Sequence, residues 1–250
     1  MSTSFRCQVF SIDTAGLNNL VKILCSLSAT VVPLCYFSVI KLRAIIAEMI
    51  MVNCQILVDR LLRDIRRFIP IFANMQFGAL ALDLCCGTGE QVIEFGKSGI
   101  TATGIDIDSN ILKAALKNKA KNNLENISFQ QADATNLPFP DCHFDCVSIS
   151  FGLHDKARMT RKKIVSEMIR VVKQNGTLIF VDFQVPLPAN ISGLTARTIE
   201  FLVGGEHYRN FKDYRRSGGL ENLLKNQNLR KVEQVLLKNR LVTAMRIVKS

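Results

Sequence analysis

Two glycines and an aspartate in the middle of the chain have the types and spacing found in sites for nucleotide-type cofactors. Gly87 and Gly89 follow an apolar run at residues 79–86 and precede a helix-like segment that begins near Glu90. Glycine backbone at such a turn can approach a ligand closely and adopt torsion angles that other residues avoid. Asp106 ends the next apolar run, nineteen residues after Gly87, where a carboxylate can accept hydrogen bonds from both hydroxyls of a ribose.

A dinucleotide cofactor is not indicated by this glycine pattern. The dinucleotide fingerprint has a third glycine, which would fall at position 92, and this chain has Val92 there. The close packing of the helix over a pyrophosphate is therefore not encoded. NAD and FAD are disfavoured for this reason.

The elements around these residues predict a parallel sheet with crossover helices. Short apolar runs at residues 127–134 and 144–150 follow the first two and alternate with helix-like segments. A helix is expected from about Arg161 to Lys173, then a turn at Asn175–Gly176 and a strand over residues 177–183. Near the C-terminus, residues 231–239 and 240–248 predict two strands joined by a tight turn.

Four segments occur in an order and spacing that resemble a known enzyme family. They are LDLCCGTG, GIDID, QADATNLPFPDCHFDCVSISFGLHD and RVVKQNGTLIFVDF. Over about residues 78–185 they are similar to the successive motifs of class I S-adenosylmethionine-dependent methyltransferases. The LPF, FD and FGL run is most similar to the small-molecule branch that includes the ubiquinone and menaquinone C-methyltransferases. The resemblance implies an α/β, Rossmann-like, seven-stranded and mostly parallel sheet with an antiparallel last strand.

The resemblance also implies S-adenosyl-L-methionine as the cofactor and assigns residues to its amino-acid part. Asp83 would hold the methionyl ammonium, directly or through water. Cys85, Gly87 and Gly89 would form the turn that makes room for this part of the cofactor.

The same resemblance assigns residues to the adenosine and sulfonium parts of the cofactor. Asp106 would hold the ribose hydroxyls and Ile107 would pack on the adenine. Asp133 would accept the exocyclic amine, with the backbone of Ala134 nearby, and Ser150 would border the sulfonium and the incoming acceptor. Capping and turn chemistry is the alternative explanation for the acidic residues, because Asp is common at strand ends and helix starts.

Candidate catalytic residues lie in two segments expected to be loops that face the acceptor. A methyl group on a sulfonium is already activated, so the protein supplies mainly alignment, and a base helps only where the acceptor must lose a proton. His154 and Asp155 follow the FGL motif, where the quinone branch commonly has an Arg, so the same acceptor is not implied. His207 and Tyr208, between the fifth and sixth strands, could bind or deprotonate a polar or anionic acceptor.

Charge leaves the acceptor class open. The net charge is +11, and residues 156–250 hold nineteen Lys and Arg against seven Asp and Glu. This surplus suits an anionic substrate, a membrane surface or nucleic acid. A small-molecule or lipid-like acceptor is the leading hypothesis; an RNA methyltransferase is less favoured, because no Asn/Asp-Pro-Pro-aromatic motif follows the fourth strand, and a non-catalytic cofactor-binding protein is the third.

The domain organisation predicted is an N-terminal helical cap or membrane-associating segment at residues 1–70 and a methyltransferase domain at residues 71–250. Residues 23–40 carry no charge, a length at the lower bound for a membrane span, but Pro33 interrupts them. Whether they span, touch or avoid a membrane stays open.

Cysteine usage predicts a reducing compartment, hence a cytoplasmic protein, and it leaves membrane association open. The eight Cys contain no CxxC pair. Cys142, His143 and Cys146 lack a second pair of ligands at zinc spacing, so no metal site is expected.

Overall fold

The computed structural model describes residues 62–225, 227 and 229–249. The chain divides into two compact units, one of which is residues 12–65 and is described only from residue 62. The residues expected to form an N-terminal cap or membrane-associating segment therefore lie almost wholly outside the described part. Within that part, no helix combines the length and the apolar character needed to cross a membrane.

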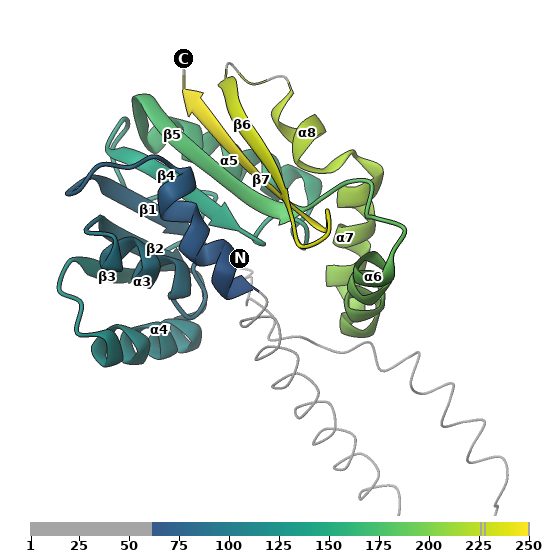
Figure 1. Ribbon diagram of the computed structural model, residues 1–250, viewed down its shortest axis with the longest axis horizontal. Helices are drawn as coiled ribbons and strands as arrows, with labels where there is room; N and C mark the ends of the chain where they lie inside the picture. The colour runs from purple at the N-terminus through teal and green to yellow at the C-terminus, as the bar shows by residue number, and fades with distance from the viewer. Residues whose placement is uncertain (1–61, 226, 228, 250) are drawn as a thin grey trace, which may run out of the picture. The chain divides into compact units, whose positions relative to one another are not determined.

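Seven strands of the described chain form one sheet in the order β3-β2-β1-β4-β5-β7-β6 (Figure 1). The pairs among β1 to β5 are parallel, whereas β7 is antiparallel to both of its neighbours. This arrangement confirms the predicted Rossmann-like fold with an antiparallel last strand. The strands are β1 Leu80–Leu84, β2 Thr101–Asp106, β3 Ile127–Gln131, β4 Phe144–Ser150, β5 Val172–Phe183, β6 Leu229–Leu237 and β7 Val242–Lys249.

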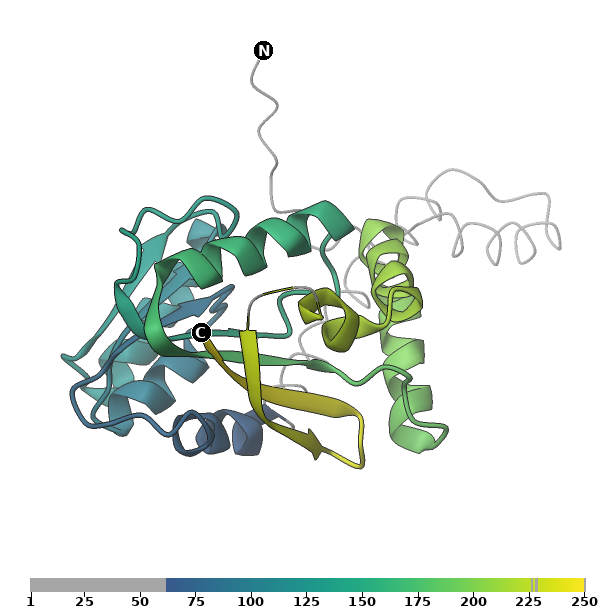
Figure 2. The same ribbon diagram turned by 90° about the horizontal axis from the view of Figure 1, so that it is seen from above.

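Helices cover both faces of this sheet. Figure 2 shows α5 on one face and the helical residues 66–72 on the other. Helices α3 and α4 pack on β1 to β3, and α5 packs on β4 and β5. The helices are α3 Glu90–Lys97, α4 Ser109–Asn122, α5 Arg158–Val171, α6 Ile191–Val203, α7 Gly205–Arg216 and α8 Gly219–Leu224.

The central strands are buried on both faces, which explains their continuous apolar sequence. Leu82 of β1, Ile149 of β4 and Phe180 of β5 are at most 1% exposed and belong to one core cluster. Each such side chain contributes about 1.5–3 kcal/mol by leaving water. The strands that carry the polar residues at their ends are thus anchored by the core.

The prediction of a turn at Asn175–Gly176 is wrong. Helix α5 ends at Val171 and β5 begins directly at Val172, so these two residues lie inside a strand. The pairing of β4 with β5 shifts register here, from Phe144 opposite Val172 to Cys146 opposite Thr177. Asn175 has φ +60°, a conformation that Asn adopts in turns and in bulges alike. Here it forms a bulge that does not interrupt the strand.

The predicted C-terminal hairpin is present, with strands at Leu229–Leu237 and Val242–Lys249. Lys238, Asn239 and Arg240 in its turn all have positive φ. The chain therefore reverses within a few residues and places β7 between β5 and β6.

A buried arginine, Arg161 of α5, connects the loop after β4 to α7. Its Nε donates a hydrogen bond of 2.8 Å to the backbone oxygen of Lys156. Its Nη2 donates to the backbone oxygen of Asn210 at 3.1 Å and to Asp213 Oδ2 at 2.8 Å. The guanidinium thus holds together the two segments that contain the candidate catalytic histidines.

Replacing Arg161 with Leu should lower the free energy of unfolding by about 2 kcal/mol, because backbone acceptors and a carboxylate lose a charged donor. Urea denaturation measures this loss. Lys162→Leu, at an exposed position of the same helix, is the matched control and should change stability by less than about 0.5 kcal/mol. Equal stability of the two variants would contradict the connecting role of Arg161.

Candidate active site

Asp106 and the glycine turn meet at the carboxyl edge of the sheet. The backbone N–H of Gly87 donates to Asp106 Oδ2 at 3.0 Å, and the N–H of Asp108 donates to Asp106 Oδ1 at 3.1 Å. Each carboxylate oxygen can accept a further hydrogen bond. The sequence pattern predicts that these residues belong to one site. The structure brings them together, with the carboxylate of Asp106 oriented toward the glycine turn.

Gly87 and Gly89 are each needed in the turn for a different physical reason. A Cβ at Gly89, where φ is +79°, would lie 2.4 Å from Phe129 Cζ, so this glycine permits close packing of the turn on β3. A Cβ at Gly87, where φ is +54°, would meet no atom within 4 Å. The space beside Gly87 is therefore open to a ligand.

Cys85 begins this turn in a conformation that favours glycine, with φ +53°. Burial, together with the neighbouring carboxylates of Asp106, Asp155 and Asp83, raises the pKa of its thiol to about 12, against the opposing charge of Lys156. Cys85 is therefore protonated at neutral pH.

Asp83 lies under the turn, near the end of β1, and is 2% exposed. Ser148 Oγ on the neighbouring strand donates to Asp83 Oδ1 at 2.6 Å. Burial raises the pKa of Asp83 to about 7, although the hydrogen bond from Ser148 and the charge of Arg66 act in the opposite direction. A nearby cation would favour the ionised form of this carboxyl group.

The raised pKa of Asp83 predicts a pH dependence of stability. Between about pH 4 and pH 7 the folded protein retains a proton that the unfolded chain has lost, so this group makes stability fall as pH rises through that window and level off above it. Asn keeps the acceptor for Ser148 and does not titrate. Asp83→Asn should therefore gain stability relative to the native protein, on the order of 2–4 kcal/mol between pH 4 and pH 8.

Urea midpoints of the two proteins across this pH range measure the difference. Because both chains share every other titrating group, their difference isolates Asp83. A difference in stability that is constant with pH would show that the pKa of Asp83 is not raised.

The residues expected around adenine lie next along the same edge. Ile107, directly after β2, is 40% exposed. Asp133 is exposed after β3, where its Oδ1 accepts 2.8 Å hydrogen bonds from both the N–H and the hydroxyl of Thr135, and Ala134 is half-buried. Asp133 thus makes the local turn contacts that were its alternative explanation, and among the described residues no side chain or backbone group donates a hydrogen bond to its Oδ2.

Ser150 ends β4 and faces the same edge of the sheet. Its Oγ is buried and has no hydrogen-bond partner among the described residues. A buried hydroxyl without a partner is costly. It suits a site that is completed by a bound molecule.

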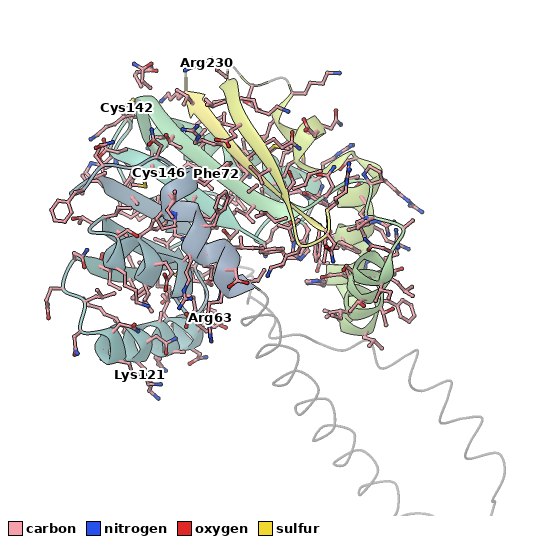
Figure 3. The ribbon with its side chains drawn as sticks, viewed as in Figure 1. Arg63, Phe72, Lys121, Cys142, Cys146 and Arg230 are labelled. Atoms are coloured by element: carbon pink, nitrogen blue, oxygen red, sulfur yellow. The ribbon has the colours of Figure 1, made fainter. Side chains whose placement is uncertain are left out.

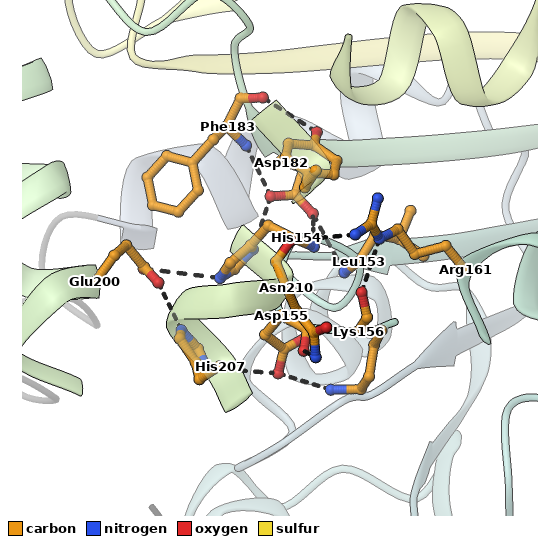
Figure 4. Close-up of polar contacts among 11 residues, drawn as sticks. Leu153, His154, Asp155, Lys156, Arg161, Asp182, Phe183, Glu200, His207 and Asn210 are labelled. Atoms are coloured by element: carbon orange, nitrogen blue, oxygen red, sulfur yellow. Dashed lines mark hydrogen bonds and ion pairs between the residues drawn. The ribbon is translucent and has the colours of Figure 1, made fainter. Parts of the chain in front are cut away.

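A second polar cluster, formed by His154, Asp155, Asp182, Glu200 and His207, lies beyond the ends of β4 and β5 (Figure 4). His154 Nδ1 is 2.8 Å from Asp182 Oδ1. Asp182 Oδ2 accepts the backbone N–H groups of Leu153 and His154, each at 3.2 Å. Asp182, itself fully buried, therefore fixes both the loop after β4 and the ring of His154.

Glu200 joins the two imidazoles of this cluster. Its Oε1 is 3.8 Å from His154 Nε2, and its Oε2 is 2.5 Å from His207 Nε2. On the other side of the second ring, His207 Nδ1 is 3.9 Å from Asp155 Oδ2. Each ring therefore lies between two carboxylates.

Neighbouring groups of opposite charge determine the ionisation of His154 and Asp155. Burial alone would lower the pKa of His154, but Asp182, by charge and hydrogen bond, and then Glu200 raise it to about 9. Burial acts to raise the pKa of Asp155, yet Lys156, His154 and His207 hold it below its usual value. At neutral pH His154 is thus protonated and Asp155 is ionised.

His207 and Tyr208 do not lie in a loop, as the sequence suggested, but in the first turns of α7. His207 points to the cluster, whereas the ring of Tyr208 packs against Phe201 at 5.4 Å and lies 5.1 Å from Lys212 Nζ. Adjacent helical residues project in different directions. The structure therefore brings His154, Asp155 and His207 together and leaves Tyr208 beside them.

Sequence reasoning missed Asp182 and Glu200. Asp182 had a usable signal, because it stands near the end of a predicted strand like the acids that were recognised. Glu200 interrupts an apolar helical segment, IEFLV, and a single acid in such a segment favours a specific buried role. Its pairing with His207 depends on the angle between α6 and α7, which no local pattern gives.

The two parts of the site are in contact through Gly152. A Cβ at this position would lie 3.0 Å from Cys85 Cβ. The loop that carries His154 and Asp155 therefore packs directly on the glycine-rich turn.

Cys142 and Cys146 do not converge. Cys142 is exposed before β4, whereas Cys146 is buried within that strand (Figure 3). In the described part of the chain, the one group of side chains with the proximity of metal ligands is His154, Glu200 and His207.

The comparisons with known proteins agree with this fold. Residues 81–176 match the family model described as a methyltransferase domain. The ubiquinone/menaquinone biosynthesis C-methyltransferase UbiE of Pseudomonas paraeruginosa is 35% identical over 132 residues, which are 51% of this chain and 50% of that enzyme. The chain spans about half the length of the curated relatives it matches.

Solved structures share the fold at lower identity. A SAM-dependent methyltransferase from Aquifex aeolicus superposes with a TM-score of 0.56 at 15% identity, over 74% of this chain and 89% of that one. A SAM-dependent methyltransferase from Methanosarcina mazei gives a TM-score of 0.56 at 20% identity, over 72% of this chain and 97% of that one.

The matched residues and the fold thus resemble class I S-adenosylmethionine-dependent methyltransferases, as the sequence motifs predicted. More particularly, this domain resembles the UbiE C-methyltransferases. S-adenosylmethionine is the cofactor that the family implies.

Proposed function

We propose that this protein transfers a methyl group from S-adenosylmethionine to a small, lipid-like acceptor, with residues 71–250 as the catalytic domain and residues 1–70 as a cap or membrane-associating segment. The observation that carries the proposal is the hydrogen bond between Gly87 N–H and Asp106, which joins a glycine turn to a strand-end carboxylate directly beside a polar cluster. Cofactor and acceptor groups would then meet at one edge of the sheet.

The residues present fit the cofactor. The open space beside Gly87 admits an amino-acid group, and the carboxyl group of Asp83 lies below it to face an ammonium. Asp106 would accept hydrogen bonds from the ribose hydroxyls, and the exposed side chain of Ile107 would contact the adenine ring. Ser150 Oγ gains a polar neighbour near the sulfonium.

When bound, S-adenosylmethionine supplies a methyl group on a positively charged sulfur, and the acceptor's electron pair forms the new bond as the carbon–sulfur bond breaks toward sulfur. The protein aligns the acceptor and receives its proton. Asp155 is ionised and its Oδ1 has no hydrogen-bond partner among the described residues, so we assign to Asp155 the role of accepting this proton, with His207 beside it to position its carboxylate. His154 orients the acceptor, while Tyr208 borders it.

The outer side of α6 favours a lipid-like acceptor. Ile191, Leu194, Phe201 and Leu202 of this helix are each more than half exposed. Glu200 on the same helix points inward to the cluster. An acceptor with an apolar tail would reach the polar groups along this helix, and the UbiE relatives are named for ubiquinone and menaquinone biosynthesis.

Asp106→Ala should weaken S-adenosylmethionine binding by at least about tenfold, because charge-assisted hydrogen bonds are each worth about 1.5–3 kcal/mol. Isothermal titration calorimetry measures this change. The control is Asp108→Ala, which removes a nearby carboxylate that caps α4 by accepting the N–H of Asn110 and should leave the affinity unchanged. An Asp106→Ala protein that binds the cofactor normally would contradict the proposed pocket.

A labelled-methyl assay with S-adenosylmethionine should show transfer into a component of metabolite or lipid extracts. Gly87→Val should abolish the transfer, because the larger side chain fills the open space beside the turn. Transfer into RNA instead, weakened steeply by salt as phosphate contacts are, would contradict a small-molecule acceptor. Absence of transfer to every extract by a protein that binds the cofactor would favour a non-catalytic role.

A further inference from the structure

The strongest unassigned feature is the convergence of two imidazoles on one carboxylate. One ligand atom from each of His154, Glu200 and His207 lies within 4.8 Å of the other two. Both histidines present Nε2 to Glu200, at 3.8 Å and 2.5 Å. The three side chains come from the loop after β4, from α6 and from α7, so the tertiary fold alone brings them together.

The opposite nitrogens of both rings face carboxylates. His154 Nδ1 is 2.8 Å from Asp182 and His207 Nδ1 is 3.9 Å from Asp155. Histidines that bind metal through one nitrogen usually direct the other to a carboxylate or a carbonyl, which fixes the ring and raises its basicity. Asp182 does this for His154, and its own oxygens are further held by backbone N–H groups.

Burial and charge are those of a cation site. His154 and Glu200 are each 6% exposed, and His207 is half-buried, which leaves one side of the cluster accessible. Three carboxylates, from Asp155, Asp182 and Glu200, surround two imidazoles. A divalent ion that displaces the Nε2 protons of these imidazoles would bring the same positive charge to the carboxylates.

The geometry points to a binding site for one divalent transition-metal ion, with Nε2 of His154, Nε2 of His207 and the carboxylate of Glu200 as its ligands. Two imidazoles and a carboxylate are a ligand set that suits Zn²⁺ and other first-row divalent ions but not Mg²⁺, which prefers oxygen. The sequence had led us to expect no metal site. That expectation was based on Cys142, His143 and Cys146 alone, and His154 lies far from Glu200 and His207 in the chain.

Three protein ligands leave a coordination position for a further molecule, as in catalytic zinc sites. We assign this position to an oxygen atom of the acceptor, whose hydroxyl or carbonyl group the ion would orient and polarise. This second assignment rests on the proposed methyl transfer. Metal binding itself does not.

Cobalt titration of the full, untagged and chelator-treated chain tests the site. Co²⁺ should bind one per chain, produce visible d–d absorption and be displaced by Zn²⁺. His207→Gln and Glu200→Gln should each lower the Co²⁺ affinity by more than about 100-fold, and Asp182→Asn by about 10-fold, as loss of a supporting carboxylate does. His143→Gln is the matched control, because this exposed histidine lies outside the cluster, and should bind normally.

Circular dichroism and calorimetry with S-adenosylmethionine show whether each variant is folded, since the cofactor residues are not altered. No Co²⁺ binding by the native chain, unchanged binding by both His207→Gln and Glu200→Gln, or a thiolate charge-transfer band from cysteine ligation would each overturn the inference. A protein that binds S-adenosylmethionine but no metal refutes only the metal site. A protein that binds Co²⁺ but neither the cofactor nor a methyl acceptor refutes only the proposed function.

Discussion

Parallel pairing of β1, β2, β4 and β5 is the constraint on which the site depends. The register places Asp83 opposite Ser148 and Ser150 opposite Val181, so the ends of these strands reach the same edge of the sheet. Polar side chains that are distant in sequence therefore meet there without any special long-range interaction. The buried core on both faces supplies the stability that keeps these polar groups in place.

Much of the cofactor half of this edge could be predicted from the sequence. A strand, a glycine turn and a helix start are local patterns, and Asp106 stands where the next strand must end. The contact between Gly87 and Asp106 follows from that topology. The bulge at Asn175 was mistaken for a turn, because the same local conformation serves in both and only the pairing with β4 distinguishes them.

The acceptor half was less predictable, for a physical reason. His154 and Asp155 follow a strand and could be placed, but Glu200 reaches them only because α6 and α7 fold back over the loop after β4. Arg161 stabilises part of this arrangement by hydrogen bonds to Lys156 and Asn210. Such helix-to-loop packing is set by side chains that are far apart in sequence, and no periodicity reports it.

Cys85 has a consequence for the chemistry that its neighbours carry out. A methyl sulfonium alkylates good nucleophiles, and two adjacent cysteines stand at the turn that would hold it. Burial raises the pKa values of both thiols, to about 12 for Cys85, and a thiol that keeps its proton is a poor nucleophile. The domain can thus keep a reactive alkylating agent beside sulfur without modifying itself.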